Sequence, residues 1–134
     1  MSSYVLDASV AVAAVRTSER SHREARARLG AVLTGADLII VPVIFDVEVV
    51  SALVRGGGQY AAVREFLDRD LGTRQLVSIG PREARAISSL AAAARLRAAD
   101  AAYVWVANSR GLPLVTLDLE VQNKAGSLCR VETP

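Results

Sequence analysis

Three short, mostly apolar runs constrain the fold of this 134-residue chain more than any other feature. They are Tyr4–Leu6, Leu38–Val41 and Leu114–Thr116. Compact apolar runs of this kind are typical of parallel strands that are buried on both faces of a sheet. Gln75–Ile79 and Leu128–Val131 are predicted to be two further short strands.

The segments between these runs have helical patterns. Helices are predicted directly after Asp7 and over residues 22–33, 42–55, 60–70, 81–95, 98–109 and 119–125. Ser21 and Glu24 have the spacing of a capping box, and Pro42 is expected in the first turn of its helix. Because strands alternate with helices, the sequence predicts one domain, residues 1–134, with an α/β sandwich fold. Its central sheet is expected to be mainly parallel, with helices on both faces.

The composition narrows the chemistry that the chain can perform. Its single histidine, His22, excludes a histidine-rich metal site and leaves little room for a Ser-His-Asp or Cys-His mechanism. Any hydrolytic chemistry must therefore rest on carboxylates. Its single cysteine, Cys129, excludes an internal disulfide and suits a reducing compartment, so we expect the protein in the cytoplasm.

The chain is apolar for a soluble protein, with 51% hydrophobic residues and a mean hydropathy of +0.29. The only candidate membrane span, Leu38–Val54, contains Pro42, Asp46 and Glu48, which argues against a bilayer helix. No signal peptide is visible at the amino terminus. The helix after Pro42 is apolar almost all round, which predicts burial on every side and hence a partner surface, because a small domain seldom buries such a helix alone.

Four acids stand in apolar surroundings. Asp7 and Asp118 directly follow predicted strands, whereas Glu48 and Asp100 lie in helices that otherwise look like core. Isolated buried carboxylates are costly, and four that converge without a cation would repel one another. Mg²⁺ or Mn²⁺ would resolve the repulsion, because hard cations prefer oxygen ligands.

Each acid also has an ordinary structural explanation. Asp7 could cap the helix that follows it, and Asp100 could complement a helix dipole. Asp118 could be a turn residue, and Glu48 could pair with an arginine. The combination of all four in this order is what favours a site.

In these blocks the chain resembles PIN-domain ribonucleases, and most of all the VapC-type toxins of VapBC toxin–antitoxin systems. The matching blocks are Val5–Ser9, Glu48 in its aliphatic helix, Leu96–Tyr103 and Leu112–Asp118. The resemblance implies a PIN-like three-layer sandwich and a metal pocket of Asp7, Glu48, Asp100 and Asp118. Asp7 and Asp100 would be the first choices for direct Mg²⁺ contact, with Mn²⁺ as a substitute, and Ser9 and Thr116 would brace the pocket.

The activity implied by the resemblance is Mg²⁺-assisted hydrolysis of RNA phosphodiester bonds by the toxin of a type II toxin–antitoxin pair. The implied partners are RNA, a cognate antitoxin and a second copy of the chain. Two alternatives keep the fold: a PIN nuclease in RNA maturation or quality control, and a catalytically silent domain that binds RNA or a partner. A signalling receiver domain fits less well, because Lys124, the only lysine, lies in a polar segment.

The charge balance is compatible with a phosphate-bearing substrate. The net charge is +2, and without the four acids the chain carries 16 basic and 10 acidic side chains. Five arginines cluster in the first polar loop and the helix after it, namely Arg16, Arg20, Arg23, Arg26 and Arg28. Some of them could hold the RNA backbone, although a solvated helix face with Glu19 and Glu24 interspersed is the favoured explanation for most of them. The few aromatic residues do not indicate a platform for base stacking.

Overall fold

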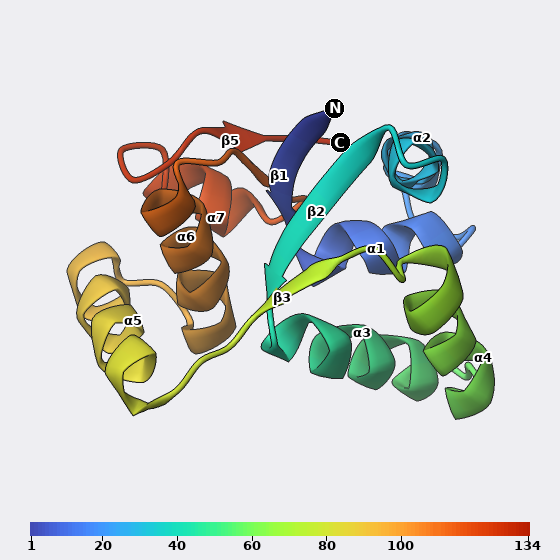
Figure 1. Ribbon diagram of the computed structural model, residues 1–134, viewed down its shortest axis with the longest axis horizontal. Coiled ribbons are helices and arrows are strands. Elements are labelled where there is room, and N and C mark those ends of the chain that lie inside the picture. Colours follow the sequence, from blue (N-terminus) through green and yellow to red (C-terminus); the bar gives the residue numbers. More distant parts are fainter.

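The computed structural model describes all residues, Met1–Pro134, and its centre is a five-stranded sheet. The strands are β1 (Ser2–Leu6), β2 (Asp37–Pro42), β3 (Gln75–Val77), β4 (Leu114–Val115) and β5 (Val131–Glu132). Every pairing is parallel, and the strand order is β3-β2-β1-β4-β5 (Figure 1). The predicted α/β fold with a mainly parallel sheet is therefore confirmed.

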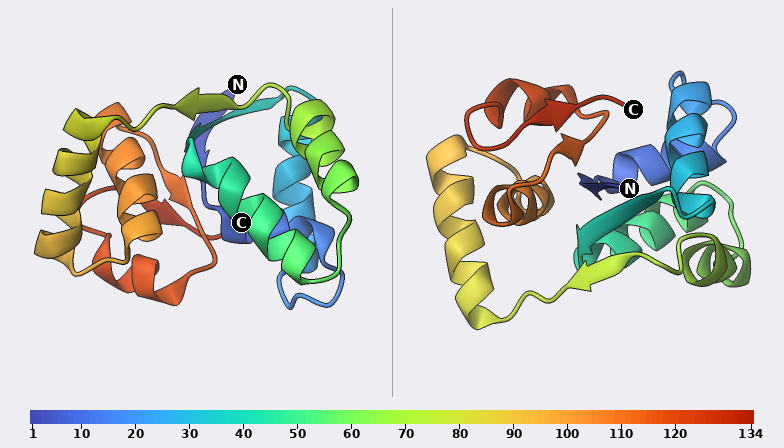
Figure 2. Two further views of the ribbon diagram at one scale, coloured as in Figure 1. Left: turned by 90° about the horizontal axis from the view of Figure 1, so that it is seen from below. Right: turned by 45° about the horizontal axis from the view of Figure 1, so that its top comes forward.

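Seven α-helices and one π-helix connect the strands. They are α1 (Ala8–Val15), α2 (His22–Leu33), α3 (Ile44–Arg55), α4 (Tyr60–Glu65), the π-helix η1 (Phe66–Asp70), α5 (Pro81–Ala94), α6 (Ala98–Arg110) and α7 (Leu119–Lys124). Helices α5 and α6 lie on one side of the sheet and α1, α2 and α4 on the other, so that the sheet is the middle layer (Figures 1 and 2). None of the helices is both long and apolar enough to cross a bilayer.

The residues at the centre of the sheet are completely buried. Val5 and Leu6 of β1 are fully buried, as are Leu114 and Val115 of β4. Helix α6 covers these strands with a nearly continuous buried face that includes Val104. Continuous burial on both faces explains why these strands are apolar runs rather than alternating patterns.

One predicted helix start and one predicted helix cap are wrong. Pro42 does not begin α3; it is the last residue of β2, paired with Val77, and the helix starts two residues later at Ile44. The φ angle of proline is compatible with an extended strand, so that the strand pairing continues through this residue. Ser21 precedes α2, but its side chain forms no capping hydrogen bond, because its backbone (φ −97°, ψ 20°) is not in the extended conformation typical of an N-cap.

One face of α3 stays exposed within the single chain, so burial of this helix on every side is not found. Val47 is 62% exposed, and Val43 and Val54 are also exposed. These three residues are spaced about one helical turn or a multiple of it apart, and they form one stripe, which we call the α3 stripe. The opposite face of α3, with Phe45, Val49 and Leu53, is buried in the core.

Candidate functional site

The sheet topology creates a natural crevice between β1 and β4. The chain leaves β1 toward β2 on one side and later returns to place β4 on the other side. In open parallel sheets, such a switch in strand order leaves space for a ligand at the carboxyl ends of the strands. Asp7 directly follows β1, and Thr116 and Asp118 follow β4, so all three lie at this edge.

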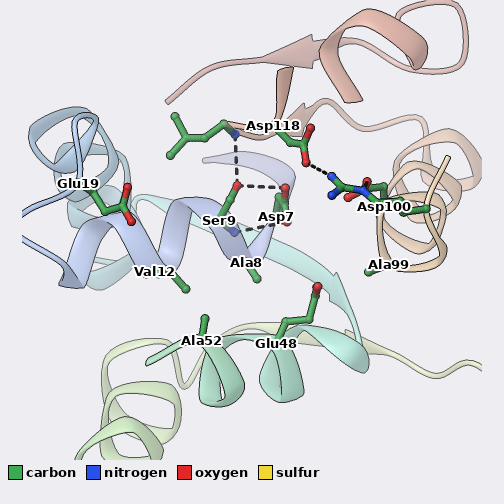
Figure 3. Close-up of a pocket in the computed structure, with 12 residues that line it drawn as sticks. Asp7, Ala8, Ser9, Val12, Glu19, Glu48, Ala52, Ala99, Asp100 and Asp118 are labelled. Carbon is green, nitrogen blue, oxygen red and sulfur yellow. Dashed lines mark hydrogen bonds and ion pairs between the residues drawn. The ribbon is translucent and has the colours of Figure 1, made fainter. Parts of the chain in front are cut away.

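The four predicted acids line one cavity at this edge, with a volume of about 520 Å³. Asp7 and Asp118 come from the strand ends, Glu48 from α3 and Asp100 from the first turn of α6 (Figure 3). The remaining lining residues are Ala8, Ser9, Val12, Glu19, Ala52, Arg97, Ala99 and Leu117. Residues from opposite ends of the chain thus contribute to the same cavity.

Asp7 is both a helix cap and part of the cavity wall. Its side chain accepts a hydrogen bond from the Ser9 backbone N–H, as an N-cap residue does, at 3.4 Å. Its Oδ2 also accepts from Thr116 Oγ1 at 2.6 Å and from Ser9 Oγ at 3.0 Å. Burial raises the pKa of Asp7, whereas the hydroxyl donors oppose that rise. Asp7 therefore caps α1 and lines the cavity at the same time.

Ser9 and Thr116 join the two strand ends. Thr116 is fully buried, and its hydroxyl also accepts from the Asp118 backbone N–H at 3.0 Å. Ser9 Oγ accepts from the Leu117 backbone N–H at 3.3 Å. Each hydroxyl thus contacts the Asp7 carboxylate and the backbone that follows β4.

Asp118 divides its two carboxylate oxygens between structure and cavity. Oδ1 accepts from the backbone N–H groups of Glu120, at 2.8 Å, and Val121, and so caps α7. Oδ2 pairs with the Arg97 guanidinium. The turn residue that the sequence allowed is thus also a cavity residue.

Arg97 is a cavity residue that the sequence reasoning missed. Its Nε lies 2.9 Å from Asp100 Oδ2, and its guanidinium also contacts Asp118. Burial raises the pKa of Asp100, and the hydrogen bond and charge of Arg97 oppose the rise. The contact with Asp100, three residues away along the chain, could have been inferred from helix geometry, whereas the contact with Asp118 depends on the tertiary fold.

Glu48 is the only one of the four acids on α3. Its Oε1 accepts a hydrogen bond from the buried Tyr103 Oη at 2.7 Å, a contact that the sequence did not predict. Burial raises the pKa of Glu48, and the charges of Asp7 and Asp100 add to this effect against the Tyr103 hydrogen bond. Asp46, two residues earlier, does not line the cavity and pairs with Arg74 at 2.6 Å.

The donor set of the cavity fits a hard divalent cation in its chemistry. All its acidic groups are carboxylates, and burial raises the pKa of three of them, so a cation would stabilise their charged forms. No group of three or more acidic, histidine or cysteine side chains is arranged to hold one ion together. Each of the four predicted carboxylates is instead turned toward a partner within the protein, namely hydroxyls for Asp7, a phenol for Glu48 and Arg97 for Asp100 and Asp118.

The five arginines of the first loop and α2 have different surroundings. Arg28 stacks on the Tyr4 ring, 4.9 Å from its centroid, and pairs with Glu132, so it has a structural role. Arg16 donates to the carbonyl of Ala52 at the end of α3 and lies beside Glu19. Arg20, Arg23 and Arg26 are exposed.

Comparison with known proteins identifies the family to which the chain belongs. Residues 4–127 match the PIN domain family, and the chain belongs to that family, whose members are generally nucleases. The resemblance seen in the sequence is therefore confirmed at the level of the family. A sequence comparison with curated proteins found no significant match.

Solved structures share this fold at low sequence identity. VapC20 of Mycobacterium tuberculosis, described as a sarcin-ricin loop cleaving toxin, superposes with a TM-score of 0.72 at 16% identity, over 92% of this chain and 94% of its own. VapBC2 of Rickettsia felis, bound to a DNA fragment from its promoter, superposes with a TM-score of 0.70 at 14% sequence identity, over 98% of each chain. PAE2754 of Pyrobaculum aerophilum superposes with a TM-score of 0.69 at 23% sequence identity, over 96% of this chain and 82% of its own.

Proposed function

We propose that this protein is a Mg²⁺-dependent endoribonuclease and the toxin of a type II toxin–antitoxin pair. The observation that carries the proposal is the convergence of Asp7, Glu48, Asp100 and Asp118 on one cavity at the carboxyl edge of a parallel sheet. Membership of a family of nucleases and the shared fold of a toxin described as cleaving the sarcin-ricin loop support it. The chain would act in the cytoplasm as a single domain, residues 1–134.

In this proposal, Asp7 and Asp100 hold Mg²⁺ or Mn²⁺ directly, and Glu48 and Asp118 complete the acidic wall. The ion would supply a bound water of lowered pKa and a positive charge beside the scissile phosphate. Thr116 and Ser9 hold the Asp7 carboxylate in place through two hydroxyl donors. Hydrogen bonds of this kind, from residues that do not touch the metal, orient the metal-binding carboxylate before the substrate binds.

The tyrosine beside Glu48 has a comparable role. Tyr103 is almost completely buried, and its hydroxyl binds only one of the two carboxylate oxygens of Glu48. The second oxygen stays available to accept a proton or a ligand from the cavity. Burial also raises the pKa of Glu48, which favours uptake of a proton by this carboxylate.

We propose that the RNA backbone passes the end of α3. A smaller hollow of about 240 Å³ is lined by Arg16, Ala52, Arg55 and Gly56, and Ala52 also lines the acidic cavity. Two guanidinium groups beside a carboxylate site could bind the phosphates on either side of the cleaved bond. The exposed Arg20, Arg23 and Arg26 would add salt-dependent affinity.

The proposed protein partners are a cognate antitoxin and a second copy of the chain. The VapBC2 neighbour is described as a complex bound to promoter DNA, which supports an antitoxin here. The exposed α3 stripe of Val43, Val47 and Val54 supports self-association, because monomeric proteins seldom leave such apolar faces uncovered.

The test is incubation of the purified protein, freed of any antitoxin, with total RNA in Mg²⁺ or in chelator, followed by sequencing of the cleaved ends. The unchanged protein is expected to cleave RNA in Mg²⁺ but not in chelator. Asp7→Asn and Asp100→Asn are expected to lose cleavage in both conditions. Asp68→Asn, an exposed acid on η1 outside the cavity, is the matched control and should cleave normally. Equal cleavage by all variants would overturn the site, and RNA binding without cleavage would indicate a silent domain.

A further inference from the structure

The Arg97 guanidinium is the only positive charge among the residues that line the acidic cavity. It contacts three carboxylates: Asp100 at 2.9 Å, Asp118, and Glu120 with Nε–Oε2 at 3.6 Å. The first two are cavity residues, whereas Glu120 lies in the first turn of α7 and outside the lining. Arg97 therefore bridges Asp100, a proposed metal ligand, and Asp118, which belongs to the same acidic wall.

We propose that Arg97 is a positioning residue that holds Asp100 and Asp118 together until a divalent cation displaces it. This inference rests on the proposed metal-dependent function and adds an internal competitor to it. The guanidinium binds Oδ2 of Asp100, a proposed direct ligand of the cation, and Oδ2 of Asp118 in the same acidic wall. A cation held by Asp100 would therefore compete with the guanidinium for the same carboxylate.

The surroundings of Arg97 make such displacement easy. Its side chain is 64% exposed, so moving it outward removes little buried contact. Ion pairs with that degree of exposure contribute little free energy, because solvent screens them. A divalent ion brings twice the charge and prefers carboxylate oxygens, so it should win the competition.

Glu120 gives the displaced guanidinium a place to go. It already lies within reach of Arg97 at the rim of the cavity, and it also pairs with Lys124. If the Arg97 side chain swings outward, it gives up its contacts with Asp100 and Asp118 and keeps its contact with Glu120. Arg97 would then share Glu120 with Lys124, and the two cavity carboxylates would become free for the ion.

Titration calorimetry with Mn²⁺ on the full-length protein tests this inference without measuring cleavage. Arg97→Gln should bind Mn²⁺ about fivefold more tightly than the unchanged protein at low ionic strength, because a competing ion pair is removed. Arg95→Gln removes the same charge two residues away, from a side chain that takes part in none of the ion pairs, and should change the affinity by less than about twofold. Arg97→Lys keeps the positive charge but not the forked guanidinium, so its Mn²⁺ affinity should lie between that of the unchanged protein and that of Arg97→Gln.

Thermal unfolding separates this role from a merely structural one. Without metal, Arg97→Gln should melt at a lower temperature, since Asp100 and Asp118 then repel each other. Added Mn²⁺ should raise its melting temperature more than that of the unchanged protein. If Arg97→Gln lowers the melting temperature equally with and without Mn²⁺, Arg97 makes only a structural contact and the inference is overturned.

The outcomes also separate this inference from the proposed function. If the unchanged protein binds Mn²⁺, Asp7→Asn abolishes binding and Arg97→Gln binds no more tightly, only the role of Arg97 fails. If neither the unchanged protein nor Arg97→Gln binds Mn²⁺, the metal-dependent function fails and the competition fails with it.

Discussion

Tyr103 Oη donates a 2.7 Å hydrogen bond to Glu48 Oε1 and so links α6 to α3 across the acidic cavity. The tyrosine is 1% exposed, and burial together with the Glu48 charge raises the pKa of its hydroxyl. The phenol therefore stays a neutral donor at pH values at which an exposed tyrosine would already ionise. One buried phenol thus fixes the orientation of the only cavity acid on α3.

Replacing Tyr103 by phenylalanine should weaken both stability and cleavage. We expect a loss of about 1 kcal/mol in the free energy of unfolding, because one hydrogen bond from a buried tyrosine to a half-buried carboxylate disappears. RNA cleavage should fall as well, since Glu48 is no longer held. Urea unfolding and a cleavage assay measure the two effects.

Tyr4→Phe is the matched control for this prediction. The Tyr4 hydroxyl donates to Asp37 at 3.2 Å at the opposite, amino-terminal edge of the sheet. Its loss should lower stability by a similar amount without affecting the cleavage rate. Equal effects of both substitutions on cleavage would contradict the special position of Tyr103.

Thr116→Val should be costly although the two side chains have nearly the same shape. The substitution removes the donor to Asp7 and the acceptor of the Asp118 N–H, both inside the protein. We expect a loss of about 1–3 kcal/mol in unfolding free energy, because the polar partners are left unpaired. Thr116→Ser retains the hydroxyl and should keep most of the cleavage activity, so similar inactivity of both variants would refute this explanation.

Arg74→Met should destabilise the fold without touching the cavity. The Arg74 side chain is 8% exposed, pairs with Asp46 at 2.6 Å and donates to the Leu71 carbonyl. Removing it leaves the Asp46 carboxylate with only the more distant Arg64, so a cost of about 3 kcal/mol is expected. Thermal unfolding measures this cost, and Mn²⁺ affinity of the folded variant should be unchanged.

Alkylation of Cys129 should be slow in the folded protein. Burial raises the pKa of this thiol, and only the thiolate reacts, so the reactive fraction at about pH 8 is smaller than in the unfolded chain. As the pH rises, the iodoacetamide rate of the unfolded chain should level off first and that of the folded protein later. Coincident pH profiles in buffer and in urea would contradict this shift.

Val47→Arg should disrupt self-association through the α3 stripe. Val47 is the most exposed of the three stripe residues, and a charge there would be buried against a second copy. Light scattering should show a dimeric mass for the unchanged protein and a monomeric mass for the variant. Leu119→Arg, a substitution at an exposed apolar residue on α7, is the control and should leave the mass unchanged.

The order and type of most elements follow from the amino-acid sequence alone. Fully buried parallel strands need continuous apolar runs, and this requirement identifies β1, β2 and β4 from the residue pattern. It also points to the four acids, because a carboxylate beside such runs is conspicuous. Their gathering in one cavity matches that reasoning, whereas their role as metal ligands remains a prediction.

Tertiary packing sets which groups meet the acids. Arg97 reaches Asp118 across 21 residues, and Tyr103 reaches Glu48 across 55, so neither contact follows from local spacing. Packing also places Pro42 at the end of a strand and leaves Ser21 without a capping bond, because strand register and backbone angles override local preference. A local pattern reports how a residue prefers to fold, but the partner of a charged group is set by the packing of elements far apart in the chain.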